Sequence, residues 1–110
     1  MNQRMFLAEF VGTAALLAGV VGSGIMAERL SPGDVGLQLL QNAIATAAVL
    51  VALILALQKA SGAHFNPAVT LAARLSNELS TRVALGYIVA QFTGAVLGVS
   101  LANLMFELPA

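Results

Sequence analysis

The chain contains no cysteine, so it can form neither a disulfide nor a thiolate-ligated metal site. Charge is also scarce, because Lys, Arg, Asp and Glu make up only 9% of the 110 residues. Soluble domains carry about 25% charged residues. Hydrophobic residues make up 59% of the chain, and the mean hydropathy is +0.91. This balance predicts a protein that is embedded in a membrane.

The sequence also lacks the residue combinations that catalysis or cofactor binding requires. It shows no nucleophile–base pair, no cluster of metal ligands and no phosphate-binding loop, so we expect neither an enzyme nor a bound cofactor. It has no basic patch, which argues against a nucleic-acid partner. It has no linker, low-complexity tract or internal repeat, so residues 1–110 are expected to form one membrane domain.

Three long runs are nearly free of charge and approach or exceed the ~20 residues that a transmembrane helix needs. A signal peptide is the alternative for the first run, because Arg4 precedes it. Glu9 interrupts that run and no convincing cleavage site follows, which favours a helix. The expected transmembrane helices cover residues 4–28, 35–58 and 82–106.

Small residues recur at every fourth position in two of these helices. The pattern runs from Gly86 to Ala102 and from Ala15 to Ser23. Such spacing lines one helical face with small side chains, which lets helix backbones approach closely in lipid. We interpret these residues as packing positions of a tight bundle.

The segment Ser61–Thr70 is too polar, and too broken by Gly and Pro, to span a bilayer. Asn66 is a favoured N-cap and Pro67 is favoured in a first helical turn, so a short helix is predicted over Pro67–Leu75. It would rise roughly 13 Å, about half the hydrocarbon thickness. We therefore expect a re-entrant segment over residues 59–76. Irregular backbone at membrane depth is tolerated where it is buried or lines a water-filled cavity, which points to a pore.

These residues resemble a known family. Ser-Gly-Ala-His-Phe-Asn-Pro-Ala-Val-Thr, from Ser61 to Thr70, resembles the first Asn-Pro-Ala loop of the aquaporins, or major intrinsic proteins. Ala8–Thr13 resembles their first-helix signature, and Gly86-Tyr87, Ala90-Gln91 and Gly94 resemble their third-helix pattern. The resemblance implies an all-α membrane protein with three transmembrane helices plus one re-entrant half-helix, half of an inverted-repeat bundle. It also implies passive passage of water and small uncharged solutes.

The resemblance also implies roles for the loop residues. The Asn66 amide would donate a hydrogen bond to a passing water or solute, with the positive end of the half-helix repelling cations. The residues before it are expected to be extended, with their carbonyl groups facing the pore. His64 would line the cytoplasmic vestibule, and a pH response of its imidazole is the less favoured reading. The expected pore-lining residues are Gly62, Ala63, His64, Phe65 and Asn66, and the half-helix motif continues with Pro67, Ala68 and Val69.

Glu9 is an ionisable residue inside the first helix, where such groups are costly and pair with polar partners. In the family this glutamate accepts N–H bonds from the re-entrant loop, so Glu9 and Gln91 are expected to brace the loop. A proton relay is the alternative. No second intramembrane acid or base stands nearby to complete a relay, which favours the brace.

The second helix carries a polar stripe, Gln38, Asn42 and Thr46, at a spacing of four residues. Counted back from Asn66, Thr46 falls at the family's selectivity constriction, where water channels and glycerol facilitators carry a bulky aromatic residue. The small Thr46 implies a wider opening for polyols or metalloid hydroxides such as arsenite, with Asn42 also facing the pore. The alternative is a packing threonine that bonds back to its own helix.

The family's pore needs two inverted repeats, and this chain carries one. The resemblance therefore implies a partner chain with the second repeat, and a homotetramer if the channel is complete. A truncated product, or an accessory structural membrane protein without its own pore, is the alternative. The cations Arg4, Lys59, Arg74 and Arg82 outnumber Arg29. By the positive-inside rule they predict an inner or plasma membrane protein with a cytoplasmic N-terminus.

Overall fold

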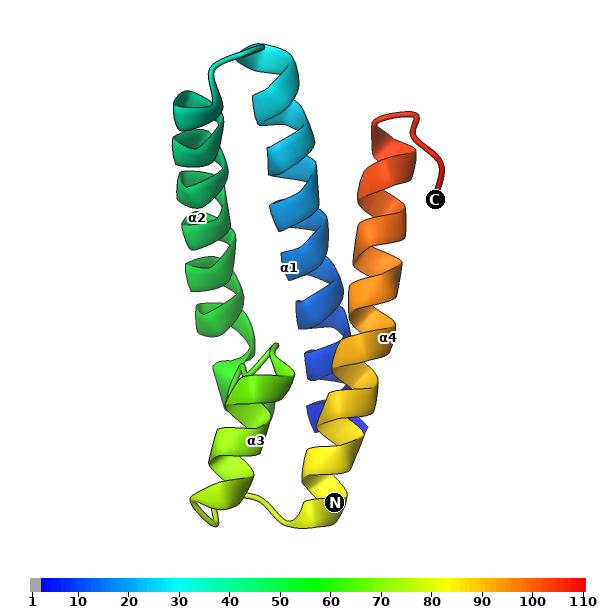
Figure 1. Ribbon diagram of the computed structural model, residues 1–110. Helices are drawn as coiled ribbons and strands as arrows, with labels where there is room; N and C mark the ends of the chain where they lie inside the picture. Colours follow the sequence, from blue (N-terminus) through cyan, green and yellow to red (C-terminus); the bar gives the residue numbers. More distant parts are fainter. Residues whose placement is uncertain (1–2) are drawn as a thin grey trace.

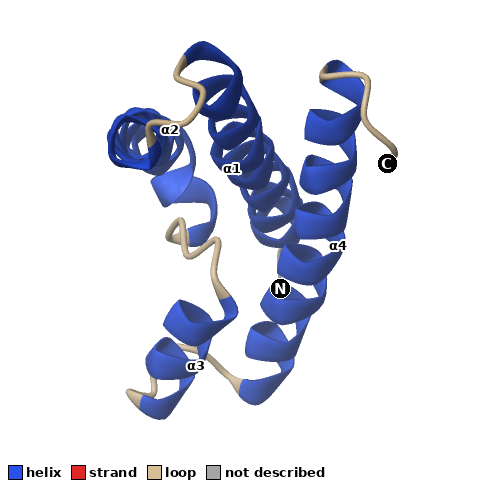
Figure 2. Cartoon of the chain, turned by 45° about the horizontal axis from the view of Figure 1, so that its top comes forward, coloured by secondary structure: helices blue, strands red, loops and turns tan. Residues whose placement is uncertain are grey.

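The computed structural model describes residues 3–110, which form four helices and no strand. Figure 1 shows the three long helices side by side and the short α3 near the end where the N-terminus lies. Helix α1 packs against both α2 and α4, and Figure 2 shows it between them from a second direction. The helices are α1 (Gln3–Leu30), α2 (Val35–Ser61), α3 (Pro67–Leu75) and α4 (Thr81–Met105).

The three long helices are each long and apolar enough to cross a membrane. The described part of the chain measures 47 × 25 × 21 Å, so its long axis exceeds the hydrocarbon thickness of about 30 Å. The two chain ends lie at opposite ends of this axis (Figure 1). The predicted fold class, three spans plus a half-helix, is therefore confirmed.

The helix ends follow from local capping chemistry. Asp34 caps α2 by accepting the Leu37 N–H at 3.0 Å, and Ser80 caps α4 by accepting the Val83 N–H at 3.2 Å. One predicted boundary is wrong: residues 59–61 are the last turn of α2 and not part of the re-entrant segment. The reason is Gly62, which has φ 85° and donates its N–H to the Gln58 carbonyl at 2.7 Å, a left-handed helix cap.

The interface between α1 and α4 depends on glycine. A Cβ at Gly94 would collide with the Phe10 carbonyl, and one at Gly98 would collide with the Ala14 carbonyl. Backbone groups cannot move aside as side chains do, so the two helices approach this closely only because both positions lack a side chain. Ala102 continues the same face and is completely buried.

The interface between α1 and α2 is looser and partly polar. A Cβ at Gly19 would stand 3.0 Å from a Val49 methyl group, a contact with a side chain and not with backbone. Asn42 donates from Nδ2 to the Val20 carbonyl and to Ser23 Oγ, each at 2.9 Å. Among the described residues of α2 only Ser61 is buried, so most of its apolar surface stays exposed.

Candidate functional site

The short helix α3 begins partway along the bundle and runs toward the end where the N-terminus lies (Figure 1). Asn66 is its N-cap, with extended backbone and with Oδ1 accepting the Ala68 N–H at 2.8 Å. Pro67 occupies the first turn, where its missing N–H costs nothing. The Asn66 Nδ2 makes no hydrogen bond within residues 3–110, and the side chain is exposed. The free amide donor therefore stands at the positive end of a helix inside the bundle.

The Glu9 carboxylate lies beneath this helix start and is fully buried. Its Oε2 accepts the Ser61 hydroxyl at 2.6 Å and the His64 N–H at 3.2 Å. Its Oε1 accepts the Phe65 N–H at 2.9 Å and Gln91 Nε2 at 2.8 Å. Four donors thus surround one carboxylate, which is what a charge taken out of water requires.

The loop before α3 is not extended, and that prediction is wrong. Gly62, Ala63 and Phe65 have positive φ values of 85°, 54° and 53°. Such angles are unfavourable for Ala and Phe and need compensation from the surroundings. Here they turn the consecutive N–H groups of His64 and Phe65 toward Glu9, as in the backbone concavities that bind anions. The hydrogen bonds to the carboxylate compensate for these unfavourable backbone angles.

A second set of hydrogen bonds ties the loop to α3 and α4. Gln91 Nε2 also donates to Thr70 Oγ1 at 2.9 Å, and Thr70 Oγ1 lies 2.9 Å from His64 Nδ1. Thr70 Oγ1 can accept from Gln91 and either donate to His64 Nδ1 or accept from it, so this hydrogen bond joins the loop to α3 with either tautomer of the His64 ring.

Tyr87 closes this cluster from α4. Its hydroxyl donates to the Ser61 carbonyl at 2.7 Å, and its ring meets the His64 ring edge-on with centroids 5.1 Å apart. Sequence reasoning assigned no role to Ser61, Thr70 or Tyr87, although all three are buried. Spacing could have found Tyr87, because it stands four residues before Gln91 and so shares its helical face.

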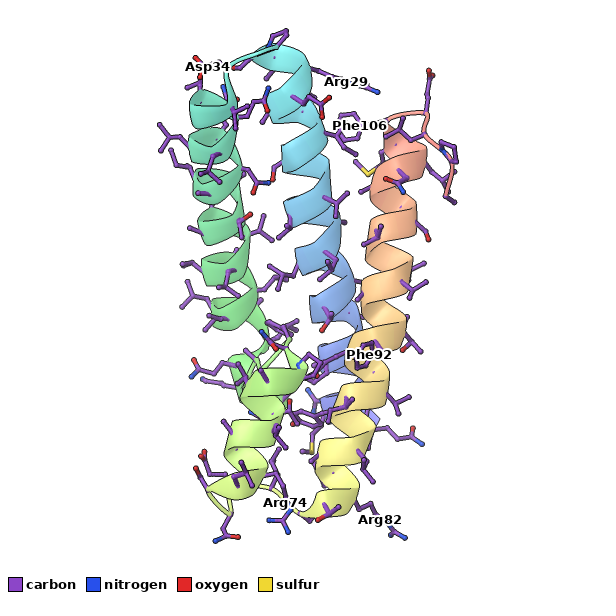
Figure 3. The ribbon with its side chains drawn as sticks, viewed as in Figure 1. Arg29, Asp34, Arg74, Arg82, Phe92 and Phe106 are labelled. Atoms are coloured by element: carbon purple, nitrogen blue, oxygen red, sulfur yellow. The ribbon has the colours of Figure 1, made fainter. Side chains whose placement is uncertain are left out.

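A cavity of about 300 Å³ opens beside the start of α3. Two buried polar atoms on its lining residues, Thr13 Oγ1 and Gln91 Oε1, have no hydrogen-bond partner within residues 3–110. Buried polar atoms are nearly always paired, so this cavity is suited to a polar occupant. Figure 3 shows Phe92, one lining residue, on α4. The lining residues are Thr13, Leu16, Leu17, Phe65, Asn66, Pro67, Gln91, Phe92 and Ala95.

The predicted site residues of α2 lie elsewhere. Neither Asn42 nor Thr46 lines the cavity at Asn66, and the Nδ2 of Asn42 is bound to α1. Thr46 Oγ1 is buried and has no partner among the described residues, so the alternative of a bond back to its own helix is wrong. On α3, Ala68 and Val69 are exposed. The structure thus unites Glu9 and Gln91 with the loop from Gly62 to Asn66, and Asn42 and Thr46 lie apart from this cluster.

Comparisons with known proteins all point to the same family. Residues 1–108 match the sequence model of a family described as Major intrinsic protein. The chain is 52% identical over 106 residues to Aquaglyceroporin AqpS of Rhizobium meliloti (strain 1021), covering 96% of this chain and 45% of that protein. It is 43% identical to the Lens fiber major intrinsic protein of Gallus gallus, covering 86% of this chain and 34% of the relative.

A third relative is Aquaporin Z of Rhodopseudomonas palustris (strain ATCC BAA-98 / CGA009), with 32% identity over 105 residues. Here 96% of this chain aligns with 43% of the relative. The chain therefore spans less than half the length of each of these curated relatives.

Proposed function

Because the chain belongs to the major intrinsic protein family, we propose that it forms one half of a transmembrane channel for water and small uncharged solutes. A second, inverted repeat on a partner chain supplies the other half. The complete channel assembles as a homotetramer in the inner or plasma membrane, with the N-terminus of this chain in the cytoplasm.

One observation carries the proposal: a helix begins inside the bundle at a neutral amide donor. Asn66 presents a free Nδ2 where the N–H groups of α3 give a positive potential. A solute oxygen can accept from this amide, whereas a cation is repelled by the helix end. Glu9 and Gln91 brace the loop that positions Asn66, through the hydrogen bonds to His64 and Phe65.

The cavity beside Asn66 supports a partner of inverted orientation. Gln91 Oε1 is an acceptor without a donor within residues 3–110, and Nε2 of the same side chain is held by Glu9 and Thr70. A second helix start that enters from the opposite face would bring unpaired backbone N–H groups to this point. The second repeat thus completes both the cavity wall and the hydrogen bonding of this half.

The solutes include molecules larger than water, such as glycerol-like polyols and neutral metalloid hydroxides such as arsenite. Thr46 is smaller than an aromatic residue, and its buried hydroxyl lacks a partner within residues 3–110. A wider constriction with a free hydroxyl suits a polyhydroxylated solute. The Rhizobium meliloti relative carries the name aquaglyceroporin, which agrees with this solute class.

The test is stopped-flow swelling of vesicles that hold this chain together with an inverted second repeat, added as a separate chain. We expect water and glycerol permeability well above that of vesicles with either half alone. Asn66→Asp keeps the oxygen that caps α3 but replaces the amide donor by a charged acceptor, and Asn66→Ala loses both the donor and the cap, so both should impair conduction or selectivity while membrane insertion is kept. Permeability at the level of empty vesicles would refute the channel, and unchanged permeability of both variants would refute the role of Asn66.

Thr46→Phe tests the solute class in the same vesicles. The aromatic ring should narrow the opening, so glycerol and arsenite permeability falls first and water permeability persists. Ile44→Phe is the matched control, because Ile44 lies on the exposed surface of the same helix with 62% of its area accessible. Equal loss of all solutes, or no loss, would show that Thr46 does not line the constriction.

A further inference from the structure

An apolar groove runs between α1 and α2 at the end of the bundle where the N-terminus lies. It holds about 240 Å³ and is lined by Arg4, Leu7, Ala8, Val11, Leu57 and Ala60. A second hollow of about 240 Å³ adjoins it, lined by Arg4, Ala56, Lys59 and Ala60. Arg4 and Ala60 belong to both, so the apolar groove passes directly into a hollow that carries two cations.

We propose that this groove binds one anionic phospholipid. An acyl chain lies along the apolar wall formed by Leu7, Val11 and Leu57, and the phosphate group lies in the hollow between Arg4 and Lys59. The ligand class follows from the arrangement of the site. The apolar groove matches an acyl chain, and the adjoining hollow with its two cations matches an anionic headgroup on the same molecule. The groove lies on the side of α1 that faces α2, away from α4.

The charges around the hollow favour an anion. Lys59 is exposed and makes no hydrogen bond or ion pair within residues 3–110. Arg4 is exposed as well and lines the same hollow. None of the residues that line the groove or the hollow is acidic. Glu9 lies on α1 nearby, but it is fully buried and its carboxylate is occupied by four donors on the loop side.

The same features argue against other occupants. A free phosphate ion would gain nothing from the apolar groove. A second transmembrane helix without an acidic residue at this level would leave the two cations at the end of the groove covered and without an anionic partner. The position also fits a lipid, because Lys59 stands in the last turn of α2, where the helix leaves the hydrocarbon region and headgroups begin.

The test is native mass spectrometry of the chain in mild detergent, titrated with phosphatidylglycerol and separately with phosphatidylcholine of the same acyl chains. We expect one tightly held phosphatidylglycerol and weaker binding of phosphatidylcholine. Lys59→Gln and Arg4→Gln should each weaken phosphatidylglycerol binding about fivefold, the effect of one cation near an anionic surface. Arg82→Gln is the matched control: it removes the same charge at the same end of the molecule, outside the groove, and should change nothing.

A second variant tests the acyl chain. Ala60→Leu fills the junction of groove and hollow without changing charge, so it should weaken both lipids. Glycerophosphoglycerol, the headgroup without acyl chains, should fail to displace the bound lipid; displacement by it would reduce the site to an anion site. Equal binding of the two lipids, an Arg82→Gln effect as large as that of Lys59→Gln, or a lipid-free dimer that Ala60→Leu dissociates would overturn the proposal.

Discussion

Helix α1 packs against α4 on one side and against α2 on the other, and the two interfaces use different contacts. Toward α4, glycines allow backbone to meet backbone, and the buried carboxylate of Glu9 reaches Gln91. Toward α2, a valine side chain and the Asn42 amide make the contact. α4 buries residues along its whole length, whereas α2 buries only Ser61.

This difference shows which part of the described chain forms its packed core. The α1–α4 interface, the loop and α3 satisfy most of each other's polar groups. Helix α2 contacts α1 along one side and leaves most of its remaining surface exposed. We therefore expect substitutions on the α4 side to cost stability and those on the α2 side to change what the chain binds or conducts.

The largest effect is expected from Glu9→Ala. The substitution leaves the Ser61 hydroxyl, two loop N–H groups and Gln91 without their acceptor, which costs about 3 kcal/mol or more. Unfolding by SDS in mixed micelles measures it. Glu28→Ala is the control, since it removes an exposed acid from the same helix and should cost little.

Glu9→Gln separates the brace from a proton relay. It keeps the side-chain size but replaces one acceptor oxygen by a donor, so it should also destabilise the loop while leaving solute flux uncoupled from protons. An ion-coupled flux that disappears in Glu9→Gln, with folding intact, would establish the relay in place of the brace.

The next largest loss of stability is expected at one of two glycines that lie in different interfaces. Gly98→Ala places a methyl group against the Ala14 carbonyl, which cannot rotate away, and should destabilise the chain by about 2 kcal/mol. Gly19→Ala meets only a Val49 methyl group at 3.0 Å, which a small side-chain shift relieves, so its cost should stay below about 1 kcal/mol. The same SDS unfolding assay applies. Equal costs would mean that the two interfaces are packed alike.

A smaller effect is expected at Asn42. Asn42→Leu removes the two hydrogen bonds to α1, and interhelical hydrogen bonds in membranes contribute about 0.6 kcal/mol on average. A double-mutant cycle with Ser23→Ala isolates the side-chain pair. A coupling above about 2 kcal/mol would place α2 in the core together with α4.

The smallest effect is expected at the far end of the bundle. Arg29 donates to the Phe106 carbonyl at 2.9 Å and lies over the Phe106 ring, 5.1 Å from its centroid, as Figure 3 shows. Arg29→Gln should speed hydrogen exchange in the last turn of α4 without changing global stability. Phe106→Leu, which keeps the carbonyl, should have about half that effect. Faster exchange throughout α4 would show that this contact supports the whole helix.

Local chemistry made much of this structure predictable. Asn66 and Pro67 define a helix start by capping and by a missing N–H, and the predicted helix and α3 have the same bounds. The loop before it was predicted wrongly because its φ values depend on Glu9, more than fifty residues earlier in the chain. The unpaired hydroxyl of Thr46 likewise depends on packing that no local pattern encodes, whereas the ends of α2 follow from the local caps Asp34 and Gly62.

The hydrogen bonds of Glu9 also impose an order on biosynthesis. Its partner Ser61 is made 52 residues later, and Gln91 is made 82 residues later. When α1 leaves the ribosome, its carboxylate therefore has none of its final donors, and α2 brings only Ser61. The loop and α4 must both arrive before the charge is fully surrounded. The first helix to be synthesised is thus among the last to complete its hydrogen bonds. If translation stops before residue 91, the Glu9 carboxylate stays in the membrane without the Gln91 donor.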